Sequence, residues 1–298
     1  MKTGSPADAT SRERREELGS GVPDAFTSSM TPAAENLPQL VIDALESEET
    51  PSSQAVRDFQ VILGSLLYCA THTRPDVAYA VGMLCRAMSR PTPALYAAAL
   101  RVLYYLYRHH DLGLRYERSE KSMHGFTDSD WAVRRSTSGH VFMHCSAAIS
   151  WSSKRQPTVA LSSCEAEIMA ASEAAKEGLY LRRFLAELGT VDEKPTALAT
   201  DNTAARDLAY NPEHHSRTKH IERRHFFIRE TVDSHELSVP FVRTAENLAD
   251  FFTKPLAAAM FFPLRDEIMN VRPCTANSRI GGCRTKSCSL PIVQSSTS

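Results

Sequence analysis

The residues best suited to chemistry in this sequence are four carboxylates, each placed where an expected strand ends or an expected helix runs. Asp128 and Asp201 each directly follow a β-prone segment. Glu167 lies in the first turns of a long expected helix, and Asp250 lies in the last expected helix. Carboxylate oxygens are hard ligands, which Mg²⁺ prefers together with water and phosphate oxygen. A crevice that gathered all four side chains would therefore suit magnesium.

Two interpretations of these carboxylates are open from the residues alone. In open α/β sheets, groups beyond the carboxyl ends of the strands converge on one crevice. Two ions ~3.5–4 Å apart in such a crevice can prepare a water for in-line attack on a phosphodiester. Alternatively, each carboxylate is an ordinary cap or turn residue, because Asp and Glu are common at helix starts and strand ends. Asp130 allows both interpretations, and a turn residue is favoured there. The metal-site interpretation holds only if the fold brings the four side chains together.

The elements that must position these residues are strands and helices that follow one another from residue 124 onward. Ser162 and Glu165 have the spacing of a capping box, which predicts a long helix that runs to Leu188 and is closed by Gly189. Two β-prone runs joined through residues 145–146 predict a hairpin. The expected elements are strands 125–127, 139–144 and 147–151, the long helix, strand 196–200, helices 203–208 and 219–232, strand 237–242 and helix 246–253. This order predicts an α/β fold with a mixed five-stranded sheet flanked by helices.

Composition divides the chain into four parts. Residues 1–55 are expected to form a flexible acidic leader, with ten acidic and four basic residues in the first 50 and one short helix near residues 40–45. Residues 56–118 predict a small region of helices that are broken at prolines. Residues 119–269 hold the strands and the carboxylates. Residues 270–298 return to Ser, Gly and Cys without periodicity, which predicts a disordered tail.

The overall composition excludes several classes of protein. A chain of 298 residues with 42% hydrophobic and 23% charged residues is typical of a soluble globular protein, not of a collagen or a coiled coil. No apolar run approaches the ~20 residues of a membrane span. The first residues lack the apolar core of a signal peptide, so we expect an intracellular protein without a membrane partner. Seven scattered cysteines do not indicate a disulfide framework.

Several motifs, in order along the chain, resemble the ribonuclease H (RNase H) domain of copia-type LTR-retrotransposon polyproteins. The motifs are Gly125–Ala132, Arg134–Gly139, Ala148–Gln156, Ala160–Glu167, Asp201-Asn202, Arg217–Ile221 and Asn247–Lys254. Upstream, Leu63–Tyr68 and Thr73–Leu84 resemble the segment that joins the reverse transcriptase to that domain. The match runs from roughly residue 59 to residue 269. So many motifs in the right order make the resemblance specific.

The resemblance implies an RNase H-like fold, preceded by a helical remnant of the reverse-transcriptase connection region. It implies endonucleolytic cleavage of the RNA strand of an RNA–DNA hybrid with two Mg²⁺ ions, for which Mn²⁺ can substitute. The catalytic and metal-binding residues carried over are Asp128, Glu167, Asp201 and Asp250, with Glu165 as a helix cap. The residues expected along the hybrid are Lys154, Arg155, Asn202, Arg217 and Lys219. An ordinary solvated charge is the alternative for each basic residue.

The rest of a polyprotein is not recognisable in this sequence. The chain holds no Tyr-x-Asp-Asp pair, so we expect no polymerase activity. Other parts of a retrotransposon polyprotein are possible partners, and the resemblance implies a cytoplasmic location. The alternative function is a catalytically inactive remnant that keeps the fold and binds nucleic acid weakly or not at all. Nothing in the sequence indicates an oligomeric state.

Overall fold

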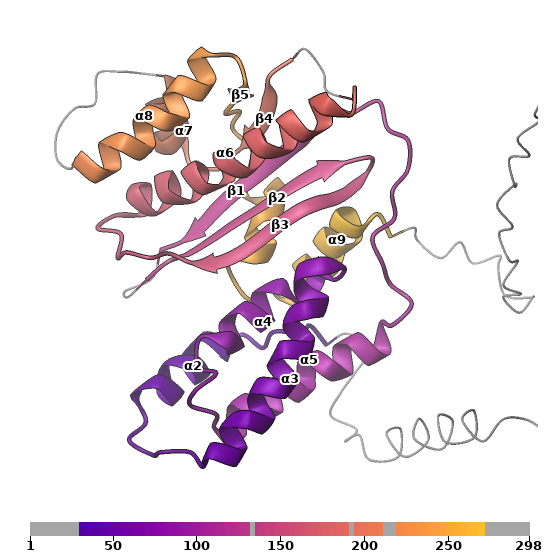
Figure 1. The fold of residues 1–298 in the computed structure, drawn as a ribbon, viewed down its shortest axis with the longest axis vertical. Coiled ribbons are helices and arrows are strands. Elements are labelled where there is room, and N and C mark those ends of the chain that lie inside the picture. The colour runs from indigo at the N-terminus through magenta and orange to yellow at the C-terminus, as the bar shows by residue number, and fades with distance from the viewer. Residues whose placement is uncertain (1–29, 132–134, 191–193, 211–218, 272–298) are drawn as a thin grey trace, which may run out of the picture.

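The computed structural model describes residues 30–131, 135–190, 194–210 and 219–271 (Figure 1). Its first part consists of helices α2 (Leu37–Glu46), α3 (Ser53–His72), α4 (Ala78–Cys85) and α5 (Pro93–Arg108), with a 3-10 turn η1 (Pro75–Val77) before α4. Two of these helices begin at hydroxyl caps. The Ser52 hydroxyl accepts the Ala55 N–H at 3.1 Å, and the Thr92 hydroxyl accepts the Leu95 N–H at 3.3 Å.

A mixed five-stranded sheet follows, as expected. Its strands are β1 (His124–Asp130), β2 (Thr137–His144), β3 (Ala147–Arg155), β4 (Thr196–Ala199) and β5 (Leu237–Ser238), in the order β3-β2-β1-β4-β5. The first three strands are antiparallel, whereas β1, β4 and β5 are mutually parallel. Cys145 and Ser146 have φ of 51° and 69°, which suits a two-residue hairpin turn. The carboxyl ends of β1 and β4 therefore lie side by side.

Helices α6 (Ser163–Glu187), α7 (Thr203–Tyr210) and α8 (Lys219–Asp233) cover one face of this sheet (Figure 1). The start of α6 confirms the predicted cap, because the Ser162 hydroxyl accepts the Glu165 N–H at 3.1 Å. In return, the Glu165 carboxylate accepts the Leu161 N–H at 2.7 Å. Buried alanines such as Ala174 and Ala175 let the helix lie close to β1 and β2. The cap and this small-residue face fix where the first turn of α6 lies.

The opposite face of the sheet is covered by the 3-10 helix η3 (Leu248–Phe252), by α9 (Ala258–Met269) and, at β3, by α4. Helices α2, α3 and α5 pack around α4, below the sheet in Figure 1. One apolar core cluster joins these helices to the sheet. Its members come from both sides of the boundary expected at residues 118–119, among them Phe59, Leu84, Val141, Phe252 and Ile268. The helical region and the sheet region are therefore packed together through a shared core.

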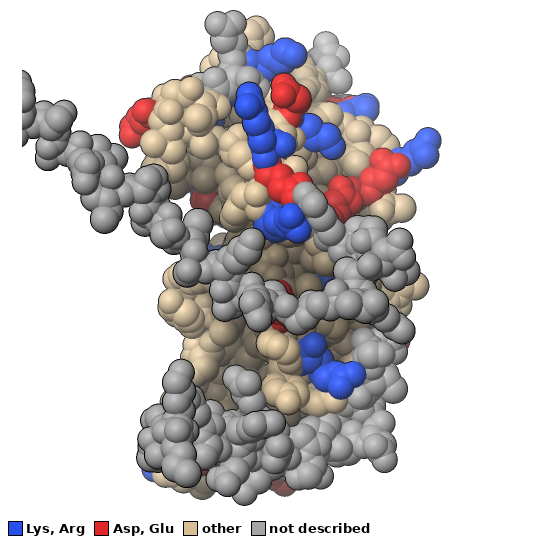
Figure 2. Space-filling model, turned by 90° about the vertical axis from the view of Figure 1, so that its right-hand side faces the viewer, with Lys and Arg blue, Asp and Glu red and all other residues tan. Residues whose placement is uncertain are grey.

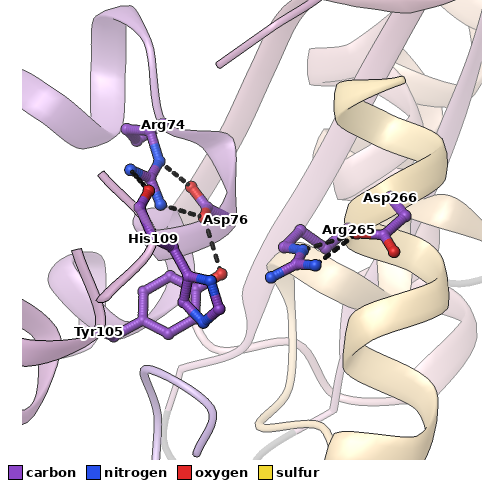
Figure 3. A network of polar contacts seen from close by, with 6 residues as sticks. All are labelled: Arg74, Asp76, Tyr105, His109, Arg265 and Asp266. Atoms are coloured by element: carbon purple, nitrogen blue, oxygen red, sulfur yellow. Dashed lines mark hydrogen bonds and ion pairs between the residues drawn. The ribbon is translucent and has the colours of Figure 1, made fainter. Parts of the chain in front are cut away.

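A buried polar network also joins the helical region to the C-terminal part of the fold (Figure 3). Arg74 donates to both carboxylate oxygens of Asp76, at 2.9 and 2.7 Å, and the Tyr105 hydroxyl donates to Asp76 Oδ2 at 2.8 Å. Arg265 of α9 points toward this network while it pairs with Asp266 at 2.6 Å. A buried carboxylate with three donated hydrogen bonds is well satisfied. The network therefore holds η1 and α5 next to α9.

Several expectations differ from the structure. The short helix expected near residues 40–45 is present as α2, but it packs into the core through Leu37, Val41 and Ala44, so residues 37–46 are part of the fold and not of a flexible leader. The expected helix 246–253 is replaced by two 3-10 turns, η2 (Thr244–Glu246) and η3, because Asn247 between them is extended and caps the Ala249 N–H. Helix α9 was not predicted. Residues 1–29 of the expected leader and residues 272–298 of the expected tail lie outside the described part of the chain. None of the described helices combines the length and the apolarity that crossing a membrane requires.

Candidate active site

Three of the four predicted carboxylates meet at one edge of the sheet. Asp128, Glu167 and Asp201 offer oxygens that all lie within 4.8 Å of one another. Asp128 and Asp201 each lie two residues beyond the parallel pair formed by Phe126 and Ala199. Their side chains are neighbours because β1 and β4 are adjacent and run in the same direction. Glu167 reaches them from the first turns of α6, which crosses this edge.

Glu167 is buried next to two other carboxylates. Its Oε1 accepts the Ser129 N–H at 3.4 Å, whereas Oε2 is buried and has no hydrogen-bond partner among the described residues. Burial raises the pKa of Glu167 to about 8, and the charges of Asp128 and Asp201 act in the same direction. A buried carboxylate oxygen without a donor, beside two further carboxylates, is a donor set that suits a divalent cation. The residues present therefore fit Mg²⁺.

Asp250, the fourth predicted carboxylate, lies beside Asp128 and is paired with a lysine. Lys254 Nζ is 2.9 Å from Asp250 Oδ2, at an i,i+4 spacing. Burial raises the pKa of Asp250 to about 7, the Asp128 charge adds to this shift, and Lys254 opposes it. Asp250 is therefore at the margin of the set that Asp128, Glu167 and Asp201 form, and its charge is balanced by Lys254.

Three site residues were not singled out from the sequence, although all lie within the motif 247–254. The Asn247 side-chain amide donates to the Thr127 carbonyl and to Asp201 Oδ1, both at 3.2 Å. The Thr253 hydroxyl donates to Asp128 Oδ2. With Lys254, these groups link the η3 segment to the carboxylates by hydrogen bonds and an ion pair. The resemblance carried over only Asp250 from this segment.

Gly139 of β2 lets the η3 segment approach the sheet. It lies opposite Asp128 in the β1–β2 ladder. A Cβ added at this position would lie 2.7 Å from Thr253 Cγ2 and 2.9 Å from Phe252 Cβ. Such distances are below van der Waals contact, so any larger residue at 139 must displace η3. The absence of a side chain here is therefore a condition for the contacts of Asp250 and Thr253.

The residues predicted to contact the substrate lie in different parts of the fold. Lys154 and Arg155 end β3 and line a hollow of about 450 Å³, together with His140, Lys176 and Arg224. Asn202 caps α7, because its side-chain oxygen accepts the Ala205 N–H at 3.0 Å. Arg217 lies outside the described residues, and Lys219 is the first residue of α8. Of the predicted contact residues whose side chains the structure describes, Lys154 and Arg155 share one hollow and Asn202 lies elsewhere.

Figure 2 shows the side of the molecule from which β1 points away. Over the part that carries the sheet and α6, Lys and Arg side chains are interspersed with Asp and Glu. Mixed signs do not provide the positive field that favours binding of a phosphate backbone. The carboxylates lie at the other end of β1, so this face contributes nothing evident to a nucleic-acid site.

Comparison with known proteins shows which proteins the chain is related to. No family model matches it. It is 40% identical over 210 residues to the retrovirus-related Pol polyprotein from transposon TNT 1-94 of Nicotiana tabacum, which covers 69% of this chain and 16% of that protein. It is 39% identical over 209 residues to the corresponding polyprotein from transposon RE2 of Arabidopsis thaliana, over 68% of this chain and 14% of that protein. The chain is a homologue of the Pol polyproteins of copia-type transposons.

The chain therefore corresponds to about one sixth of the length of these Pol polyproteins. Its fold is a mixed five-stranded sheet flanked by helices. It is similar to a solved RNase H1 in complex with an RNA/DNA hybrid, at 13% identity, over 44% of this chain and 94% of that one, with a TM-score of 0.36. It is also similar to the foamy viral protease-reverse transcriptase in complex with an RNA/DNA hybrid, at 10% identity, over 84% and 30% of the two chains, with a TM-score of 0.41.

Proposed function

We propose that this chain is a ribonuclease H that cleaves the RNA strand of RNA–DNA hybrids by metal-dependent hydrolysis. The observation that carries the proposal is the cluster of Asp128, Glu167 and Asp201, whose oxygens lie within 4.8 Å of one another at the ends of adjacent parallel strands. Homology to retrotransposon Pol polyproteins supports it. Asp250 completes the set at the margin of the cluster.

The residues of the chain have distinct tasks in this reaction. Asp128, Glu167 and Asp201 would hold two Mg²⁺ ions, or Mn²⁺ in their place, and Asp250 would add a fourth carboxylate. Bound Mg²⁺ would supply Lewis acidity at the phosphate and make water more acidic. Thr253, Asn247 and Lys254 keep the carboxylates oriented through their hydrogen bonds and ion pair. Water adds across the P–O3′ bond, so one product ends in a 5′-phosphate and the other in a 3′-hydroxyl.

Lys154 and Arg155 are proposed to contact the backbone of the hybrid from the hollow that they line. Phosphate contacts of this kind position a nucleic acid, whereas recognition of the 2′-hydroxyl distinguishes RNA from DNA. We place the activity in the cytoplasm, and the remaining parts of a retrotransposon polyprotein are proposed as partners. No polymerase activity is proposed for this chain.

A cleavage assay on the full chain tests the proposal. End-labelled RNA–DNA hybrid is incubated with Mg²⁺, with EDTA, and in parallel with duplex DNA and duplex RNA. We expect Mg²⁺-dependent cleavage of the RNA strand of the hybrid alone. Asp128→Asn and Asp201→Asn are expected to abolish it, whereas Asp43→Asn, an exposed carboxylate in α2, leaves it unchanged.

Two results of this assay would overturn the assignment. Cleavage retained by both Asp128→Asn and Asp201→Asn would show that another site acts. A folded wild-type chain that cleaves no hybrid at any Mg²⁺ or Mn²⁺ concentration would instead identify a catalytically inactive remnant. Circular dichroism on each variant establishes that a loss of cleavage is not a loss of fold.

A further inference from the structure

Arg86, the residue that follows helix α4, reaches the end of the β1–β2 pair at Asp130 and Thr137. Its Nη2 donates to Thr137 Oγ1 at 2.9 Å. The Thr137 N–H in turn donates to Asp130 Oδ1, and Asp130 and Thr137 form the last pair of the ladder. Asp130 lies two residues after Asp128 on the same strand, so both side chains lie on the same face. A residue of the helical region is thus linked through Thr137 to Asp130, at the end of the strand that carries Asp128.

Helix α4 packs closely against β3, so the backbone of Arg86 lies next to the sheet. Gly82 of α4 packs so closely that an added Cβ would lie 3.2 Å from the Ser153 carbonyl oxygen. The Trp151 indole N–H of β3 donates to the carbonyl of Ala70, at the end of α3, at 2.7 Å. The Ser153 hydroxyl donates to the Phe252 carbonyl of η3 at 2.7 Å. Helical region, β3 and η3 are therefore connected on one side of the sheet.

The charges around Arg86 favour the same arrangement. Burial lowers the pKa of the Arg86 guanidinium, and the Asp130 carboxylate and the Tyr79 hydroxyl act in the opposite direction. Asp130 is itself largely enclosed, beside Asp128. A partly buried carboxylate next to another carboxylate is unfavourable unless a positive charge or donors compensate it. Arg86 provides that charge from the helical region.

We propose that Arg86 is a positioning residue for the carboxylate cluster. Through Thr137, Arg86 holds the Asp130–Thr137 end of the β1–β2 pair and so keeps Asp128 in place. The helical region upstream of the sheet is then a working part of the metal site and not only a remnant of a larger protein. The inference rests on the proposed function for its role in catalysis. Its effect on metal binding can be measured without any substrate.

The test compares Arg86→Met, Arg86→Lys and a matched control in the full chain. The control is Arg101→Met, because Arg101 is a partly buried arginine of the same helical region whose Nε donates to the Thr31 carbonyl, at 2.8 Å, instead of to a strand of the sheet. Titration calorimetry with Mn²⁺ alone measures the metal affinity, and hybrid cleavage gives kcat and KM. We expect Arg86→Met to weaken Mn²⁺ binding and to lower kcat by roughly 10–100-fold, the range for outer-sphere residues. KM for the hybrid should not change, Arg86→Lys should restore part of the loss, and Arg101→Met should match the wild type.

Two outcomes decide against the proposal. A raised KM with unchanged kcat and Mn²⁺ affinity means that Arg86 contacts the hybrid directly. Unchanged values in all assays mean that it only packs. If Arg86→Met does not fold, Thr137→Val removes the acceptor of the Arg86 hydrogen bond at similar volume and is measured in its place. If the wild type cleaves no hybrid, the proposed function fails, and Mn²⁺ calorimetry alone decides the role of Arg86.

Discussion

The Thr253 hydroxyl donates a hydrogen bond to Asp128 Oδ2, and so a residue that follows a 3-10 turn orients a carboxylate of the first strand. Both side chains are buried, so water does not compete for this contact. The same carboxylate offers an oxygen to the cluster with Glu167 and Asp201. Thr253 therefore sets the orientation of the Asp128 carboxylate in the cluster.

Replacing Thr253 by valine should impair the reaction without unfolding the chain. Valine keeps the volume but removes the donor, so Asp128 loses its orienting hydrogen bond. We expect a roughly 10–100-fold lower kcat, as for other groups that orient metal ligands, and a higher Mg²⁺ concentration for half-maximal cleavage. Thr253→Ser keeps the hydroxyl and is the control. Equal activity of the valine and serine variants would contradict this role.

Removing the charge of Lys254 should raise the pKa of Asp250 further. The ammonium lies 2.9 Å from Asp250 Oδ2 and opposes the shift to about 7 that burial and Asp128 cause. In Lys254→Met, more of Asp250 is therefore protonated at neutral pH in metal-free protein. Carboxyl ¹³C NMR in EDTA measures this pKa directly, and Lys254→Arg should preserve the wild-type value. A lower pKa in the methionine variant is the opposite of what this geometry implies.

Stability without divalent cations should fall as pH rises. The pKa of Glu167 is about 8 in the folded protein against an ordinary value of 4.5, so folding favours its protonated form. This stabilisation is complete below pH 4.5 and is lost as the pH rises to about 8. It amounts to the order of a few kcal/mol.

Urea unfolding in EDTA from pH 4.5 to pH 9 checks the sign, and Glu167→Gln is compared with the wild type at each pH. The glutamine variant should lack the part of the slope that belongs to Glu167. Mg²⁺ should restore wild-type stability at high pH, because it binds the ionised carboxylate. A wild type that is more stable at pH 8 than at pH 5 in EDTA, relative to the variant, would refute the assignment.

A methyl group at residue 139 should displace η3 and so disturb the carboxylate site. Gly139→Ala would place a Cβ 2.7 Å from Thr253 Cγ2, so η3 must shift. We expect a loss of ~1–3 kcal/mol in stability, typical of overpacking, together with reduced cleavage. Gly64→Ala in the exposed part of α3 has nothing within 4 Å and should instead stabilise by ~0.5–1 kcal/mol. Thermal melting of both variants distinguishes a steric effect from a general effect of glycine replacement.

The parts of the fold with a local cause were predictable from the sequence. The capping box at Ser162 and Glu165 acts over three residues, and the structure contains the hydrogen bond that it implies. The hairpin at Cys145-Ser146 likewise depends on two residues in the left-handed region. The convergence of Asp128 and Asp201 followed from the rule for parallel strand ends, because both lie directly beyond the β1–β4 pairing.

The remaining features depend on contacts between distant segments. The spacing of the segment around Asp250 suited a regular helix, but extended Asn247 interrupts it because its amide bonds Thr127 and Asp201 across the fold. Helix α2 lay in a stretch whose composition predicts flexibility, yet Leu37 and Val41 pack against the helical region. Such residues carry no local signal of their partners.

The core that joins Phe59 of the helices to Val141 of the sheet has a practical consequence. Heating should melt the molecule in a single cooperative transition. A fragment that begins at residue 119 would expose the apolar face of the sheet that packs against the helices, and it should aggregate on expression. The smallest piece of this chain that can be expected to fold on its own therefore begins well upstream of β1.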